Sequence, residues 1–138
     1  MTKKHVKVKG IVFSGQGVGT SFVKLSWARK QFREKLGFDP YNGTLNLRLS
    51  ETEAKRLKNT LKRYEGIEIA PKEGFFQARC FKALLINDME AAVVIPEKPN
   101  YPSNVLEIIA PIHLRKVMSL KDNDNVEVTI LLEAGIKV

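Results

Sequence analysis

Two polar side chains, Thr44 and Asn46, stand two positions apart in the segment GTLNLRL, where polar and apolar residues alternate. This alternation predicts a strand, so the hydroxyl and the amide project from the same face. Hydroxyl and amide oxygens are hard donors that suit Mg²⁺, which completes its shell with water and substrate phosphates. On spacing alone, the solvent face of an edge strand explains the two residues better than a metal site does.

A carboxylate, Glu107, interrupts the apolar segment VLEIIAP, where the strand period places it on one face with Val105 and Ile109. A carboxylate on an apolar face needs a partner. It could orient or deprotonate a hydroxyl, as a general base does, or it could be a rim carboxylate paired with a lysine or arginine. Arg115 could bind a phosphate or a carboxylate through its planar fork, or simply be exposed.

A glycine-rich segment, SGQGVGTSF, places glycines at positions 15, 17 and 19. The spacing is not that of the dinucleotide-binding fingerprint, and the chain contains no Gly-Lys-Ser/Thr of a Walker A loop. Spacing alone favours a turn between two strands, HVKVKGIVFS and FVKLS. The alternative is a nest of backbone N–H groups that binds phosphate oxygens.

The elements that would position these residues are mostly strands. Further strands are predicted in GIEIAP, FFQARCFKALLI, EAAVVIPE, VLEIIAP and NVEVTILLE. Helices are predicted in WARKQFREKLG, in IHLRKVMSL and in SETEAKRLKNTLKRY, where Ser50 and Glu53 have the spacing of a capping box. Because no βαβ rhythm occurs, we expect a closed or nearly closed, mostly antiparallel β-barrel with helices in its connections.

Composition limits the class of protein. The chain has 138 residues and a net charge of +8, which favours an anionic partner such as nucleic acid or a phosphorylated small molecule. No apolar run is long enough to span a bilayer and no signal peptide is present, so we expect a cytoplasmic protein. The single cysteine, Cys80, excludes a disulfide framework and a multi-cysteine metal site, and we expect it to be a buried packing residue.

Taken together, GIVFSGQGVGTSFVKL, KQFREKLGFDPYNGTLNLRL, VVIPE and VLEIIAPIHLRKVMSLKDNDNVEV resemble the archaeal CTP-dependent riboflavin kinase family. The resemblance implies a six-stranded cradle-loop β-barrel. It also implies Mg²⁺-assisted transfer of the γ-phosphoryl group of CTP to the 5′-hydroxyl of riboflavin, giving FMN and CDP. Riboflavin and CTP would be the partners, without a membrane or nucleic acid. We expect one barrel domain over residues 1–138, without the N-terminal winged-helix domain of some members.

The resemblance also assigns roles to residues. Thr44 and Asn46 correspond to the family's Mg²⁺ ligands, and Glu107 corresponds to its flavin-contacting glutamate, which is also our candidate catalytic base or orienting group. The nucleotide-binding positions are Gln16, Gly17, Val18, Gly19, Thr20, Ser21, Ile112, His113, Leu114 and Arg115. The chain departs from the family at Pro99, where a flavin-contacting threonine is usual.

Two other function classes remain open. HLRKVMSLKDNDNVEVTI is similar to the swapped-hairpin transcription factors, whose pattern is a short helix, an acidic turn and a strand. A basic nucleic-acid-binding regulator is therefore the alternative. A sensor that binds flavin or nucleotide without turnover is the third interpretation.

Overall fold

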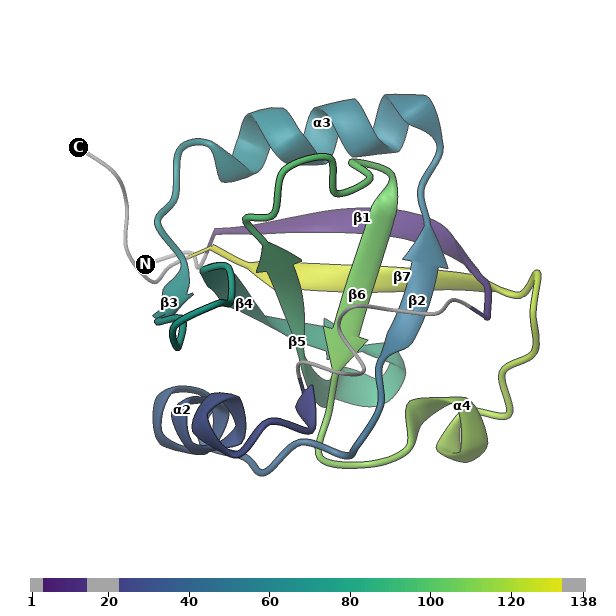
Figure 1. The fold of residues 1–138 in the computed structure, drawn as a ribbon. Helices are drawn as coiled ribbons and strands as arrows, with labels where there is room; N and C mark the ends of the chain where they lie inside the picture. The colour runs from purple at the N-terminus through teal and green to yellow at the C-terminus, as the bar shows by residue number, and fades with distance from the viewer. Residues whose placement is uncertain (1–3, 15–22, 133–138) are drawn as a thin grey trace.

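The computed structural model describes residues 4–14 and 23–132, and Figure 1 shows how their helices and strands are arranged. The strands are β1 (His5–Val12), β2 (Leu45–Arg48), β3 (Ile67–Ile69), β4 (Ala78–Leu85), β5 (Met89–Pro96), β6 (Val105–Ile109) and β7 (Asn125–Leu131). The helices are α2 (Ser26–Leu36), α3 (Glu51–Leu61) and α4 (Leu114–Val117), with a 3₁₀ turn, η1 (Ile86–Asp88), between β4 and β5.

The sheet closes into a barrel. Its strand order is β3-β4-β5-β6-β2-β1-β7, and a further pairing of β4 with β7, through Ala83 and Ile130, joins its ends. Every pairing between the described strands is antiparallel. Six strands therefore form the ring, while β3 pairs with the first part of β4 outside it. The expected closed, antiparallel, six-stranded barrel is confirmed.

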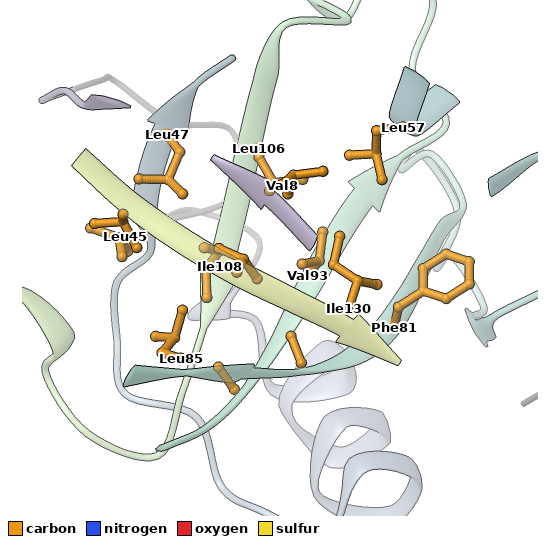
Figure 2. Packing of buried hydrophobic residues seen from close by; sticks show 14 of the residues in the cluster. Val8, Leu45, Leu47, Leu57, Phe81, Leu85, Val93, Leu106, Ile108 and Ile130 are labelled. Atoms are coloured by element: carbon orange, nitrogen blue, oxygen red, sulfur yellow. The ribbon is translucent and has the colours of Figure 1, made fainter. Parts of the chain in front are cut away.

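Alternating side chains fill the barrel. In β1 exposed and buried residues alternate along the whole strand, as the period of a half-buried strand requires. Figure 2 shows side chains from strands far apart in the sequence meeting in this core. The labelled residues of the core are Val8, Leu45, Leu47, Leu57, Phe81, Leu85, Val93, Leu106, Ile108 and Ile130.

Helix α3 covers one end of the barrel (Figure 1). It begins as the capping-box spacing predicts, because the Ser50 hydroxyl accepts a hydrogen bond from the backbone N–H of Glu53 at 3.1 Å. Its buried residues Ala54, Leu57 and Leu61 recur at helical spacing and join the barrel core. The helix thereby shields the apolar interior from water at this end.

Helix α2 packs on the outside of the barrel. Its buried residues Ala28, Phe32 and Leu36 form a second apolar cluster with outward-facing residues of β4, β5 and β6, among them Val94 and Ile109. The helix ends at Gly37, whose φ of 84° lies in the left-handed region that favours glycine. Helix α2 therefore buries part of the outer surface of the barrel.

One sequence prediction is wrong. Val23 has helical backbone, Lys24 lies in a turn and Leu25 is the N-cap of α2, so FVKLS is not a strand over its described residues. The apolar side chains of Val23 and Leu25 pack in the second cluster, which explains their alternation without a β partner. The glycine segment therefore does not connect two strands of a hairpin, and its residues 15–22 lie outside the described part of the chain.

No helix among the described residues has both the length and the apolar character needed to cross a membrane.

Among the glycines in the described part of the chain, Gly66 should be the costliest to replace. Its φ is 69°, and an added Cβ would lie 2.8 Å from Cζ of Phe81 and 2.9 Å from the backbone oxygen of Cys80. Gly74 is the matched control, because its φ is 88° but no described atom lies within 4 Å of an added Cβ. We expect Gly74→Ala to lower the free energy of unfolding by about 1 kcal/mol and Gly66→Ala by about 3 kcal/mol. Urea unfolding measures both, and equal losses would contradict the steric explanation.

Candidate active site

The outer face of β2 and β6 brings together three of the candidate residues. In the register of these strands Asn46 lies directly opposite Glu107, and Thr44 stands immediately before β2, two residues from Asn46. The Thr44 hydroxyl donates a hydrogen bond to Oδ1 of Asn46 at 3.0 Å. Two segments about sixty residues apart therefore meet in a single polar group, which the sequence alone could not establish.

The side-chain oxygens of Thr44 and Asn46 could hold a magnesium ion. Asn46 is buried and Thr44 is half-buried, so this pair is not the solvent face of an edge strand. Neighbouring ligands of an octahedral Mg²⁺ with metal–oxygen distances near 2.1 Å lie roughly 3 Å apart, which matches the separation of Oγ1 and Oδ1. Within the described residues no three His, Cys, Asp or Glu side chains gather as a metal site. Thr44 and Asn46 could thus supply part of the shell of a Mg²⁺ ion, with water or phosphate supplying the rest.

Glu107 is a buried carboxylate. Its side chain is only 1% exposed, so it is not a carboxylate at a solvent-exposed rim. The Tyr101 hydroxyl, from the segment between β5 and β6, donates a hydrogen bond to Oε2 of Glu107. Burial and this carboxylate together raise the pKa of Tyr101, so the phenol stays protonated and remains a donor. Glu107 also lies opposite Val94 of β5, at the border of the second apolar cluster. Its carboxylate is therefore held away from bulk water, with the Tyr101 hydroxyl as a hydrogen-bond donor.

The predicted nucleotide segment, residues 112–115, follows β6 and borders the same site. Together with Tyr41, Gly43 and Thr44 it lines a small cavity of about 50 Å³. His113 is the N-cap of α4, and its ring stacks on that of Tyr41 with centroids 4.6 Å apart. The Leu114 side chain is buried in the barrel core, so only its backbone could face a nucleotide. Ile112 is exposed at this cavity.

Arg115 is already engaged with a carboxylate. Its Nη1 lies 3.0 Å from Oδ1 of Asp122 and donates to the Ser14 hydroxyl at 3.1 Å. Ser14 in turn donates to both carboxylate oxygens of Asp122, at 2.9 and 3.1 Å. This network fixes the last described residue before the glycine segment against α4 and the following turn. The predicted nucleotide-binding residues Gln16, Gly17, Val18, Gly19, Thr20 and Ser21 themselves lie outside the described residues.

Sequence reasoning missed several aromatic side chains around this site. Tyr101 contacts Glu107, Tyr41 stacks on His113, and the Phe13 ring lies 4.4 Å from the guanidinium carbon of Arg48. The one sequence signal for any of these aromatic residues was that Tyr41 stands close to the GTLN segment. The prediction for Cys80 is confirmed, since the thiol is fully buried and burial raises its pKa, which disfavours the reactive thiolate.

Comparison with known proteins identifies the family. The family model for the CTP-dependent riboflavin kinase domain, described as domain of unknown function DUF120, matches residues 12–130. The chain belongs to this family. The match contains Thr44, Asn46, Glu107 and residues 112–115, so the polar group on β2 and β6 lies wholly within the family's domain.

Relatives of known name support the assignment. A protein named riboflavin kinase from Archaeoglobus fulgidus is 47% identical over 131 residues, which cover 92% of this chain and 55% of the relative. One with the same name from Methanosarcina barkeri is 41% identical over 132 residues, covering 91% of this chain and 56% of the relative. One from Ignicoccus hospitalis is 40% identical over 134 residues, covering 94% and 74%. The chain thus spans little more than half the length of the first two relatives.

Proposed function

We propose that this chain is a CTP-dependent riboflavin kinase. The observation that supports this most strongly is that Asn46 of β2 lies opposite Glu107 of β6, while the Thr44 hydroxyl donates a hydrogen bond to the Asn46 side chain. Two candidate metal ligands therefore lie beside a buried carboxylate. Phosphoryl transfer to an alcohol uses a metal ion to neutralise charge and a base to accept the proton of the alcohol. The family membership and the names of the relatives support the same substrates.

The reaction moves one phosphoryl group. The 5′-hydroxyl oxygen of riboflavin forms a bond to the γ-phosphorus of CTP, and the bond from that phosphorus to the β–γ bridging oxygen breaks. The hydroxyl proton passes to the Glu107 carboxylate and then to solvent, and CDP leaves with the bridging oxygen. Mg²⁺, held by Thr44 and Asn46, would neutralise phosphate charge when it is bound. The chain's own residues position the reactants, which is most of what such a transfer demands.

The nucleotide would be bound by two segments beside Thr44, Asn46 and Glu107. Residues 112–115 and Tyr41 border Thr44 at the small cavity, so a nucleotide there would have its phosphates near the metal ligands. The glycine segment, residues 15–22, would supply backbone N–H groups, since its glycines leave room for close approach of phosphate oxygens. The Ser14–Arg115–Asp122 network anchors the start of that segment.

Separation of flavins after incubation tests the proposal. The chain is mixed with riboflavin and Mg²⁺ and with either CTP or ATP, and the products are resolved by chromatography. We expect FMN and CDP in equal amounts with CTP, and little FMN with ATP. Absence of FMN with every nucleotide and divalent metal tried would overturn the proposal. Binding of both ligands without FMN would indicate a sensor, and salt-sensitive DNA binding without riboflavin affinity would support the nucleic-acid-binding alternative.

A further inference from the structure

Arg48 is a cation on the polar face of the site. It is on the same face of β2 as Thr44 and Asn46, and in the strand register it lies opposite Val105, two residues from Glu107. Consecutive residues on one face of a strand are about 7 Å apart, a distance that an arginine side chain spans. The guanidinium can therefore reach the space in front of Asn46 and Glu107.

The guanidinium of Arg48 is held by an aromatic ring. Its central carbon lies 4.4 Å from the centroid of the half-buried Phe13 ring, and the backbone N–H of Phe13 donates to the backbone oxygen of Asn46 at 3.1 Å. A guanidinium stacked on a ring keeps its planar edge available for hydrogen bonds. Phe13 stands immediately before Ser14 and the glycine segment, so the stacked pair lies where that segment leaves the barrel.

Arg48 is also free of acidic partners within the described residues. The arginines that form ion pairs there, Arg29, Arg33, Arg56, Arg79 and Arg115, are each neutralised by an aspartate or a glutamate. In particular Arg115, which lines the small cavity beside Thr44, is committed to Asp122. Arg48 is therefore available to an anionic ligand without first losing a carboxylate.

The order of residues along β2 indicates which part of the ligand Arg48 meets. The cavity that residues 112–115 line is at the Thr44 end, and Asn46 comes next along the strand, followed by Arg48. A nucleotide whose base is bound near that cavity would extend its phosphates along β2. Its terminal phosphate would then be the one nearest to Arg48, and the Glu107 carboxylate, which lies opposite the neighbouring Asn46, would be close to it.

We propose that Arg48 binds the γ-phosphoryl group of the nucleotide and neutralises the negative charge on its oxygens during transfer. The inference rests on the proposed function, to which it adds a catalytic residue. The bond changes are those of the kinase reaction, with Arg48 donating hydrogen bonds to oxygens that stay on phosphorus and gaining or losing no proton. Phe13 is a positioning residue, because it aims the guanidinium without touching the phosphate.

Substitution tests the catalytic part. Arg48→Met removes the charge and keeps the length of the side chain, and we expect kcat for FMN formation to fall about 100-fold. Arg48→Lys retains a charge without the fork and should recover part of that loss. The matched control is Arg63→Met, an exposed arginine that follows α3, and it should leave kcat unchanged. Arg48→Met and Arg48→Lys should both keep the wild-type affinity for riboflavin, measured from the quenching of riboflavin fluorescence.

Calorimetric binding supplies a readout that does not depend on turnover. The non-hydrolysable β,γ-methylene analogue of CTP should bind about 10-fold more weakly to Arg48→Met than to wild type, whereas CDP should bind both equally. Equal losses for the two nucleotides, or none, would overturn the role of Arg48 at the γ-phosphoryl group. Weaker riboflavin binding with unchanged kcat would overturn it by assigning Arg48 to the acceptor. A wild-type protein that forms no FMN would overturn the proposed function, while a selective loss of triphosphate affinity would still support Arg48.

Discussion

Replacing Thr44 by alanine should lower the rate of FMN formation roughly 100-fold when Mg²⁺ is limiting. Removal of groups that only support a metal ligand costs up to about 100-fold in metal affinity or activity, and a direct ligand belongs at the upper end of that range. Excess Mg²⁺ should restore part of the rate, because Asn46 and the phosphates still offer oxygens. The measurement is the initial rate of FMN formation as a function of Mg²⁺ concentration.

The fold should survive this substitution. Thr44→Ala removes the hydroxyl that donates to Asn46 at 3.0 Å, and the loss of such a hydrogen bond costs about 1 kcal/mol. This is small beside the stability of a typical domain. Thr44→Ser retains the oxygen and should keep most of the activity. Thr60→Ala is the matched control, because the Thr60 hydroxyl donates only to the Arg56 backbone oxygen on α3 among the described residues. A Thr44→Ala protein whose Mg²⁺ dependence equals that of wild type would show that Thr44 is not a ligand.

Much of the fold was predictable because its signals are local. The alternation in β1 and β7 specifies which residues enter the core, and the Ser50 side chain marks the start of α3 within a single turn. The wrong prediction of a strand after the glycines has the same origin. Val23 and Leu25 alternate like a strand, yet they pack in the second apolar cluster through contacts that a local pattern does not contain.

The residue types of the candidate site could be named from the sequence, but their geometry could not. Thr44 and Asn46 share a face because of strand period alone. The pairing of Asn46 with Glu107 depends on the register between β2 and β6, which the whole closed barrel determines. Tyr101 and Arg48 were missed because the contact of Tyr101 comes from the segment that precedes β6 and that of Arg48 from its stacking on Phe13. Neither contact leaves a spacing signal in the sequence.

Replacing Glu107 by glutamine should lower kcat by about 100- to 1000-fold, within the range that a general base contributes. Glutamine has nearly the same volume, and its amide oxygen can still accept the hydrogen bond that Tyr101 donates to Oε2. The buried packing at this position, where the side chain is 1% exposed, is therefore preserved. What the substitution removes is the negative charge and the ability to take a proton from the 5′-hydroxyl. Rates of FMN formation at saturating CTP, riboflavin and Mg²⁺ measure the effect.

Two further variants separate proton transfer from positioning. Glu127→Gln makes the same chemical change at an exposed position of β7 and should leave kcat and thermal stability unchanged. Tyr101→Phe keeps the Glu107 carboxylate but removes its hydrogen-bond donor, and we expect a smaller loss, about 10-fold, because the base is intact but less well oriented. If Glu107→Gln instead retained wild-type kcat with only a higher KM for riboflavin, Glu107 would bind the acceptor without taking its proton. Solvent would then receive that proton directly, and positioning by the barrel would be the main source of catalysis.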